Sequence, residues 1–235
     1  MKITPLSICG WQEKFPHEEG VAVVFDIFRC STTIQCLYNA KPKYLWISPS
    51  LKKIQENSVD KVKNFRIFSE LSQAIECAER FDNSPALALK NSSPTIDNHL
   101  VATTTGTPAM FAAKVFEEVY VGSLVAFSAL IEKLSQEKRP ITLIPAAFPH
   151  SNHVEDGIVA QAVATALEGY SDHKSFVHGC AAQAKEKILV SGRAKFLSEK
   201  LATGKEDTEI ALDIDRFTSI PQISFTDDPL FARVL

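Results

Sequence analysis

The chain has 235 residues, of which 45% are hydrophobic and 23% are charged, a composition typical of a soluble globular protein with a core of its own. The formal net charge of -3 excludes the overall basic field that attracts nucleic acid, so we expect no nucleic-acid partner. No run of about 18 apolar residues occurs, and we therefore expect no membrane partner and no membrane span.

In chain order, short apolar runs typical of strands alternate with amphipathic segments of helix length. The predicted elements are strand 21–25, helix 31–39, strand 43–47, strand 64–68 followed by a helix to about residue 79, a weaker strand 86–89, strand 99–104, helix 108–116, strand 118–122, helix 127–134, strand 140–147, helix 154–168, a mostly helical segment 173–212 broken near Gly192 and Gly204, and an edge strand 221–225.

This alternation favours an α/β fold, a three-layer α/β/α arrangement with a largely parallel or mixed sheet. We expect a single domain over residues 1–235, because no linker rich in Gly, Pro or Ser divides the chain. Three turns carry small hydroxyl residues, at 29–33, 103–107 and 122–123. They leave open an organisation into two similar α/β halves that share one core.

The cysteines, at positions 9, 30, 36, 77 and 180, are odd in number and form no C-x-x-C pair. This pattern argues against a disulfide framework and against a thiolate zinc site, and it favours reduced thiols. The first residues, MKITPLSICGWQEKF, lack the apolar centre of a signal peptide. We therefore expect a cytoplasmic protein.

The segment VVFDIFRCSTT, residues 23–33, is the strongest candidate for a functional site. Its strand ends at Asp26, Arg29 lies in the turn, and a helix opens at residues 31–33. Ligands of parallel α/β sheets bind where strands end, and helix N-termini favour anions. Arg29 offers a planar fork to a phosphate or carboxylate, while Asp26 suits a divalent cation or the orientation of a nucleophile. A structural interpretation competes: Asp26 caps the helix and Arg29 pairs with it.

Two later segments could complete such a site. The run TTTGT, residues 103–107, combines a glycine that permits a tight turn with threonines that can donate to an anion, although ordinary capping explains it as well. Glu155 and Asp156 begin a helix, where the helix dipole favours acids, and two carboxylates also suit a Mg²⁺ site. The spacing His150-x-x-His153-x-Glu155 could hold a transition metal, but loop histidines are more often solvated.

The chain resembles the 2-phosphosulfolactate phosphatase family over nearly its whole length. The strongest similarity is VVFDIFRCSTTIQCLYNA, which looks like the family's D-x-x-R-[AC]-[ST]-T-T-I run followed by an Asn. Five further segments show weaker similarity to motifs of the family. Ser69-Glu70 looks like its Gly-Glu pair, and Asn83-Ser84-Pro85, with a rival at Asn91-Ser92-Ser93-Pro94, looks like its Asn-Ser-Pro. Residues 103–107 look like its T-T-N-G-T, Gly122-Ser123-Leu124 like its G-S-L, and Val154-Glu155-Asp156 like its L-E-D.

The resemblance implies a Mg²⁺-dependent phosphatase, a phosphoric monoester hydrolase of a family that serves coenzyme M biosynthesis and has relatives in bacteria without coenzyme M. The implied substrate is a small phosphorylated or sulfonated organic acid, with 2-phospho-3-sulfolactate hydrolysed to 3-sulfolactate and phosphate as the named candidate. The implied metal ligands are Asp26, Glu155 and Asp156, which form the catalytic set together with Arg29. The implied substrate contacts are Arg29, Ser31, Thr32, Thr33, Glu70, Asn83, Thr104 and Thr107.

An alternative is a catalytically weakened member of this family that acts as an anion-binding or assembly protein. It is favoured by departures from the family pattern at Thr105, Ala126, Ala147 and Gln161. The enzyme is favoured by retention of the charged turn and of the Glu-Asp pair, because packing needs none of these side chains. We also expect a homodimer, which is common among compact α/β enzymes.

Overall fold

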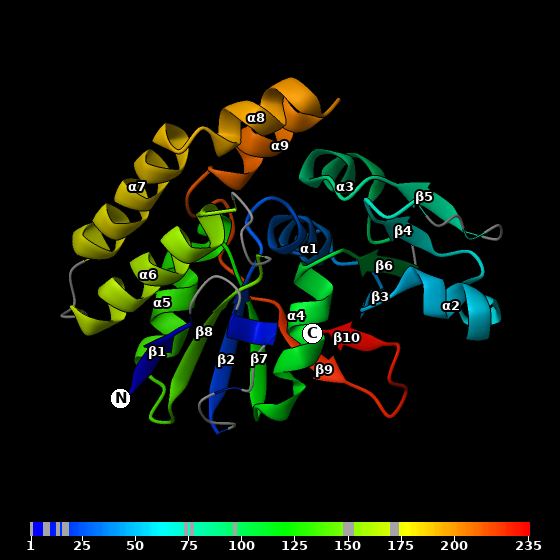
Figure 1. The fold of residues 1–235 in the computed structure, drawn as a ribbon, viewed down its shortest axis with the longest axis horizontal. Coiled ribbons are helices and arrows are strands. Elements are labelled where there is room, and N and C mark those ends of the chain that lie inside the picture. Colours follow the sequence, from blue (N-terminus) through cyan, green and yellow to red (C-terminus); the bar gives the residue numbers. More distant parts are fainter. Residues whose placement is uncertain are drawn as a thin grey trace.

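The structure is a computed structural model that describes residues 2–6, 10–12, 15, 19–72, 75, 78–95, 98–147, 153–169 and 174–235. In this part of the chain ten strands form one mixed sheet, in the order β1-β8-β2-β7-β9-β10-β3-β6-β4-β5 (Figure 1). The strands are β1 (Ile3–Pro5), β2 (Val21–Phe25), β3 (Tyr44–Ser48), β4 (Arg66–Phe68), β5 (Glu79–Phe81), β6 (Asn98–Ala102), β7 (Glu118–Gly122), β8 (Ile141–Pro145), β9 (Gln222–Phe225) and β10 (Ala232–Val234).

Helices connect most of these strands. They are α1 (Cys30–Asn39), α2 (Leu51–Asn57), α3 (Pro85–Asn91), α4 (Gly106–Ala112), α5 (Phe127–Ser135), α6 (Glu155–Glu168), α7 (Lys174–Val190), α8 (Arg193–Lys200) and α9 (Gly204–Ala211). Short 3-10 turns lie at Gly10–Gln12, Val59–Val62, Ala113–Val115 and Leu124–Ala126.

Strand β2 shows why the sheet is the middle of three layers. All five of its residues are buried, which is typical of a parallel strand covered on both faces. Val23 and Phe25 pack into a core cluster with residues of α5, α6 and α7. Ala22 and Val24 point the other way, into a second cluster with residues of α1 and α4. The predicted three-layer α/β fold with a mixed sheet is therefore confirmed.

The sheet consists of two parallel blocks joined by an antiparallel pair. Strands β1, β8, β2 and β7 form one block, and β3, β6, β4 and β5 form the other. Between them, β9 and β10 pair with each other, with β7 and with β3, and each of these pairings is antiparallel. In Figure 1, β2 and β7 stand upright whereas β3 and β6 lie across the view, so the sheet twists strongly between the blocks.

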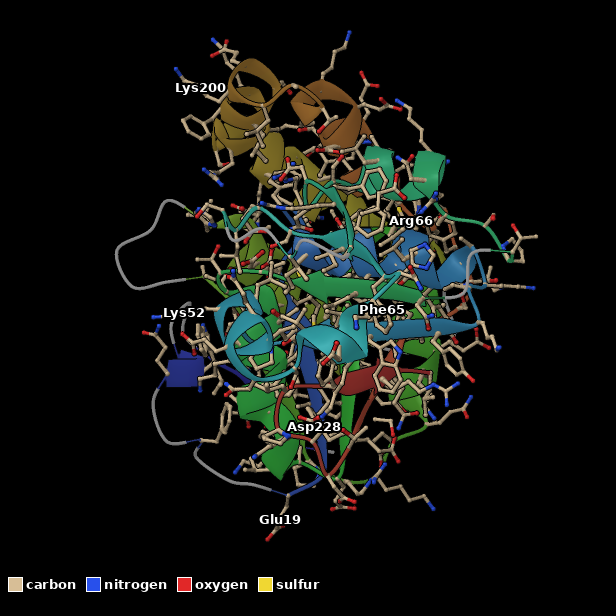
Figure 2. All side chains as sticks on the ribbon, turned by 90° about the vertical axis from the view of Figure 1, so that its right-hand side faces the viewer. Glu19, Lys52, Phe65, Arg66, Lys200 and Asp228 are labelled. Atoms are coloured by element: carbon tan, nitrogen blue, oxygen red, sulfur yellow. The ribbon has the colours of Figure 1, made fainter. Side chains whose placement is uncertain are left out.

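This twist brings together the ends of strands from both blocks. The hydroxyl of Thr105, just beyond β6, donates a hydrogen bond to Asp26, just beyond β2. In Figure 2, Lys200 of α8 lies at the opposite end of the molecule from Glu19, which precedes the start of β2. Helix α8 therefore lies at the carboxyl end of β2, where Asp26 is found, and that end of the sheet is where the candidate site forms.

Two predicted elements are wrong. The weak strand at 86–89 is part of α3, because the side chain of Ser84 accepts a hydrogen bond from the N–H of Leu87 and Pro85 occupies the first turn, where its missing N–H costs nothing. The helix predicted to run from β4 to about residue 79 is not formed by the described residues there. Instead Glu79 begins β5, which pairs in parallel with β4.

The remaining differences concern three strands and one short helix. The strand predicted at 221–225 is β9, but it lies inside the sheet and not at an edge. Helix α2 and strands β1 and β10 are not among the predicted elements. The first of these has a clear local cause, since the side chain of Ser50 caps α2 by accepting a hydrogen bond from the N–H of Lys53. The helical segment 173–212, broken near Gly192 and Gly204, is confirmed as α7, α8 and α9.

Cys30, Cys36 and Cys180 are free and buried. Cys9 and Cys77 lie outside the described residues, as does His150 of the transition-metal hypothesis. Across the described ranges, no helix combines the length and the apolar character that crossing a membrane requires.

Candidate active site

The turn between β2 and α1 is built around Asp26, which is 6% exposed. Its own N–H donates to the hydroxyl of Ser31 at 2.9 Å, and its carboxylate Oδ1 accepts from the N–H of Cys30 at 3.2 Å. The other oxygen, Oδ2, accepts from the hydroxyl of Thr105 at 3.1 Å. Asp26 thus caps α1, as the structural interpretation has it, but its carboxylate does not pair with Arg29.

Arg29 lies in a different network. Its guanidinium donates to both carboxylate oxygens of Asp82, at 2.7 and 3.2 Å, and to Asp207 at 3.1 Å. Burial by itself lowers the pKa of Arg29, but the hydrogen bonds and charges of Asp82 and then Asp207 outweigh it and raise the pKa. The planar fork that could hold a phosphate is therefore held by two carboxylates of the protein.

Asp207 is a buried junction between three parts of the fold. Besides Arg29, its carboxylate accepts hydrogen bonds from the hydroxyl of Ser84 at 2.6 Å, the N–H of Ala86 at 3.0 Å and the hydroxyl of Thr203 at 2.7 Å. It thereby ties the start of α3 and the start of α9 to the turn after β2. Four donors satisfy this carboxylate, which accounts for its burial without a metal.

Glu155 and Asp156, at the start of α6, lie near Asp26 although about 130 residues separate them from it in the sequence. Asp156 Oδ1 accepts a hydrogen bond from the N–H of Ile27 at 2.7 Å, which joins α6 to the β2–α1 turn. Glu155 is fully buried, and neither of its carboxylate oxygens has a hydrogen-bond partner among the described residues. It forms an ion pair with Arg193, whose Nε lies 3.5 Å away.

The pKa values of these three carboxyl groups reflect burial and mutual repulsion. Burial, and then the charge of Glu70, raise the pKa of Asp26 from 3.8 to about 6. Burial raises the pKa of Glu155 from 4.5 to about 7, and Asp26 adds to the effect. The pKa of Asp156 is raised well above its usual value by burial, then by the charges of Asp26 and Glu155. A bound cation would stabilise the ionised form of these three buried carboxyl groups, which otherwise repel one another.

The donor chemistry of this cluster fits Mg²⁺. Magnesium binds carboxylate oxygens, and both oxygens of Glu155 are buried without a hydrogen bond. In the described part of the chain, however, no three His, Cys, Asp or Glu side chains are gathered closely enough to ligate one ion. The carboxylates therefore suit the metal in kind, and the fit rests on their donor atoms and not on a preformed coordination shell.

A pocket of about 240 Å³ opens beside this cluster and contains five of the predicted site residues: Asp26, Arg29, Glu70, Asn83 and Thr104. The side chain of Asn83 is buried, and its Oδ1 has no hydrogen-bond partner. Glu70 accepts hydrogen bonds from the N–H and the hydroxyl of Thr104, both at 2.6 Å. The sequence therefore predicted a set of residues that the fold does bring to one place.

The other predicted hydroxyl residues do not line this pocket. Ser31 is bonded to the backbone of Asp26, and the hydroxyl of Thr32 donates to the carbonyl of Ile27 at 2.9 Å. Thr107 exchanges hydrogen bonds with Thr103 inside the β6–α4 turn. Thr33 is buried with a hydroxyl that finds no partner. In this conformation these side chains support the turns of the site.

The pocket also contains residues that sequence reasoning did not assign to the substrate: Phe28, Thr105, His153, Arg193, Leu197 and Leu201. The Phe28–Arg29 peptide bond is cis. His153 is partly buried, and burial followed by the charge of Arg193 lowers its pKa. Arg193, Leu197 and Leu201 come from α8 and the residue after it, and no local motif marks them. Only the helical spacing of these three positions, four residues apart, was visible in the sequence.

Comparison with known proteins agrees with this geometry. The family model described as 2-phosphosulpholactate phosphatase matches residues 10–225. The chain is 26% identical over 205 residues to a protein of Thermoplasma volcanium named "Probable 2-phosphosulfolactate phosphatase", an alignment that covers 86% of this chain and 89% of the relative. The predicted resemblance is thereby confirmed: the chain belongs to the 2-phosphosulfolactate phosphatase family and is a phosphatase, a phosphoric monoester hydrolase.

Proposed function

We propose that this phosphatase depends on Mg²⁺ and hydrolyses 2-phosphosulfolactate to 3-sulfolactate and phosphate. The family assignment and the name of the Thermoplasma relative support the substrate. The observation that carries the proposal is the buried cluster of Asp26, Glu155 and Asp156 beside a pocket that also holds Arg193. A phosphate ester brings negative charge, so a cluster of acids can accept it only together with a cation.

In this proposal Asp26, Glu155 and Asp156 hold the Mg²⁺ ion. The bound ion would stabilise charge on the phosphoryl group during its transfer to water. Thr105 orients Asp26 through its hydrogen bond to Oδ2. Asn83, whose buried Oδ1 has no donor, accepts a hydrogen bond from water or substrate in the pocket. Arg29 keeps Asp82 and the α3 segment in place at the pocket wall.

Phosphate release from 2-phosphosulfolactate, measured with Mg²⁺ and with EDTA, tests the proposal. We expect turnover that EDTA abolishes, and loss of activity in Asp26→Asn with the fold retained. Asp60→Asn is the matched control, because Asp60 is an exposed acid that pairs only with Lys63 among the described residues. Full activity in Asp26→Asn, or equal activity with EDTA, would overturn the assignment. Phosphate binding without turnover would instead support an anion-binding protein.

Metal binding can be measured separately from catalysis. A ligand that binds the folded state alone stabilises it by about 2.7 kcal/mol at a concentration of 100 times its Kd. We expect MgCl₂ to raise the Tm of the wild type, and Glu155→Gln to reduce this rise. An identical rise in both proteins would exclude Glu155 as a ligand. The homodimer also stays a proposal, which size-exclusion chromatography with light scattering would test.

A further inference from the structure

The pocket beside Asp26 holds two guanidinium groups in very different states. Arg29 is saturated by Asp82 and Asp207, with three hydrogen bonds to their carboxylates. Within the described part of the chain, the buried Nε of Arg193 has no hydrogen-bond partner, and it lies 3.5 Å from a carboxylate oxygen of Glu155. Among the described residues that line the pocket, Arg193 is therefore the guanidinium with donors available for a ligand.

Arg193 is fixed at the start of α8. Gly192 precedes it with a φ of +79°, a left-handed conformation that glycine adopts without strain. The N–H of Arg193 donates to the hydroxyl of Ser191 at 3.3 Å. The side chain is only 11% exposed although it carries a full charge. A buried arginine on a rigid helix start is a preorganised site for a planar or tetrahedral oxyanion.

The same helix face supplies an apolar wall next to this charge. Leu197 and Leu201 follow Arg193 at intervals of four residues and line the same pocket, together with Phe28. Positions four residues apart lie on one face of a helix. The pocket thus offers the buried carboxylate of Asp26, an apolar wall and, at the start of α8, a cation. Together these groups match a molecule with a phosphate, a short carbon chain and a second acidic group.

We infer that Arg193 binds a second acidic group of the substrate, a carboxylate or a sulfonate, and so determines the specificity for phosphorylated acids over neutral phosphate esters. This inference rests on the proposed phosphatase function. It gives α8 a role in substrate selection through Arg193, which lies next to Glu155 of the acidic cluster. A site built to pair with a charged group rejects analogues that lack it, because its own charge is left without a partner.

Three phosphate esters of similar size test the inference. Phospholactate carries a carboxylate, the phosphate ester of 2-hydroxyethanesulfonate carries a sulfonate, and isopropyl phosphate carries neither. We expect the wild type to prefer at least one of the two acidic esters over isopropyl phosphate by about 100-fold in kcat/KM. The preferred ester identifies which acidic group Arg193 binds.

In Arg193→Gln this preference should collapse to about tenfold or less, mainly through a higher KM for the acidic esters. Arg193→Lys keeps the charge without the planar fork and should retain an intermediate preference; it also serves if the glutamine variant does not fold. Lys195→Gln is the control, because Lys195 is an exposed cation on the same helix, paired with Glu199.

The outcomes separate the two proposals. Equal losses on all three esters in both Arg193 variants would assign Arg193 a structural role and overturn the inference while leaving the phosphatase intact. A wild type without preference among the three esters would also overturn it. A wild type that hydrolyses none of the esters, nor 2-phosphosulfolactate, would overturn the proposed function and the inference together.

Discussion

The guanidinium of Arg29 lies 3.1 Å from the carboxylate of Asp207, which follows it by 178 residues in the chain. The Asp207 side chain is fully buried, and that of Arg29 is 7% exposed. Removing one partner of a buried ion pair leaves the other charge uncompensated, and this typically costs about 3–5 kcal/mol. The pair therefore holds the start of the site to the C-terminal helices.

Asp207→Asn should lower the free energy of unfolding by about 3 kcal/mol, since the amide keeps an acceptor for some of the four donors but loses the charge. For a chain of this size that corresponds to a fall in Tm of about 6–12 °C. Asp213→Asn is the control, an exposed acid that pairs with Arg216. A Tm within about 1 °C of the wild type would show that Asp207 does not hold this junction.

Gly106 allows α4 to approach the β2–α1 turn. A Cβ atom at this position would lie 2.5 Å from Asp26 Oδ2 and 2.7 Å from the sulfur of Cys30. Gly106→Ala should therefore destabilise the protein by about 1–3 kcal/mol and displace the Asp26 carboxylate, with a loss of phosphatase activity.

A second glycine provides the matched control for this substitution. Gly179 lies within α7, and a Cβ there meets no atom within 4 Å. Gly179→Ala should stabilise the protein by about 0.5–1 kcal/mol and leave activity unchanged. Thermal unfolding and phosphate release, measured on both variants, check the two predictions. Equal effects of the two substitutions would contradict the close approach at Gly106.

The cluster around Asp26 should carry a trade-off between stability and activity. Since burial and then the charge of Glu70 raise the pKa of Asp26 to about 6, its ionised form costs up to about 3 kcal/mol in the folded state at pH 8. Asp26→Asn removes the charge and keeps an acceptor for the N–H of Cys30. In urea unfolding at pH 8 without Mg²⁺, the inactive variant should therefore be more stable than the wild type. A less stable variant would show that the charge of Asp26 does not destabilise the folded state.

His99 should make stability depend on pH. The residue is fully buried on β6 and stacks against Phe68, with ring centroids 5.9 Å apart. Burial, with a further contribution from the charge of Arg66, lowers its pKa from 6.5 to about 4. A lowered folded-state pKa gives stability that is present above pH 6.5 and is lost as the pH falls from 6.5 towards 4.

His99→Phe should remove this dependence while keeping the aromatic contact. Relative to the variant, the wild type should lose about 3 kcal/mol of unfolding free energy between pH 7 and pH 4. Unfolding curves at half-unit steps of pH check this difference, in which the titration of all other groups cancels. Parallel curves for the two proteins would show that His99 titrates alike in the folded and unfolded states.

Local patterns predicted the elements whose signals are contained within them. The run VAVVF at 21–25 and the run EVYVG at 118–122 are strands with the predicted bounds, because continuous apolar β-branched residues suit a strand buried on both faces. The apolar run ALAL at 86–89 suggested a strand, but the residues Pro85–Asn91 form a helix whose N-terminus is capped by the side chain of Ser84. Strand β5, ERF, has no apolar run and exists through its pairing with β4.

The residues of the candidate site also divide into those that local motifs predicted and those that depend on the fold. Asp26 and the Glu155-Asp156 pair belong to motifs that the family resemblance makes visible, and the fold brings them together. The partners of Arg29 could not be predicted, because Asp82 and Asp207 lie 53 and 178 residues away and no spacing rule connects them. Arg193 was missed for a similar reason: a single arginine after a Ser-Gly pair carries no signal until α8 is placed at the end of β2.

The order of the strands has a consequence for synthesis on the ribosome. Strands β9 and β10 come after all the others along the described chain, yet they lie in the middle of the sheet, between β7 and β3. Until they emerge, both parallel blocks present an unpaired edge to solvent or to another nascent chain, and such edges promote aggregation. Translation that stops before residue 222 therefore leaves two half-sheets with unpaired edges, so β9 and β10 protect the strands made before them from aggregation.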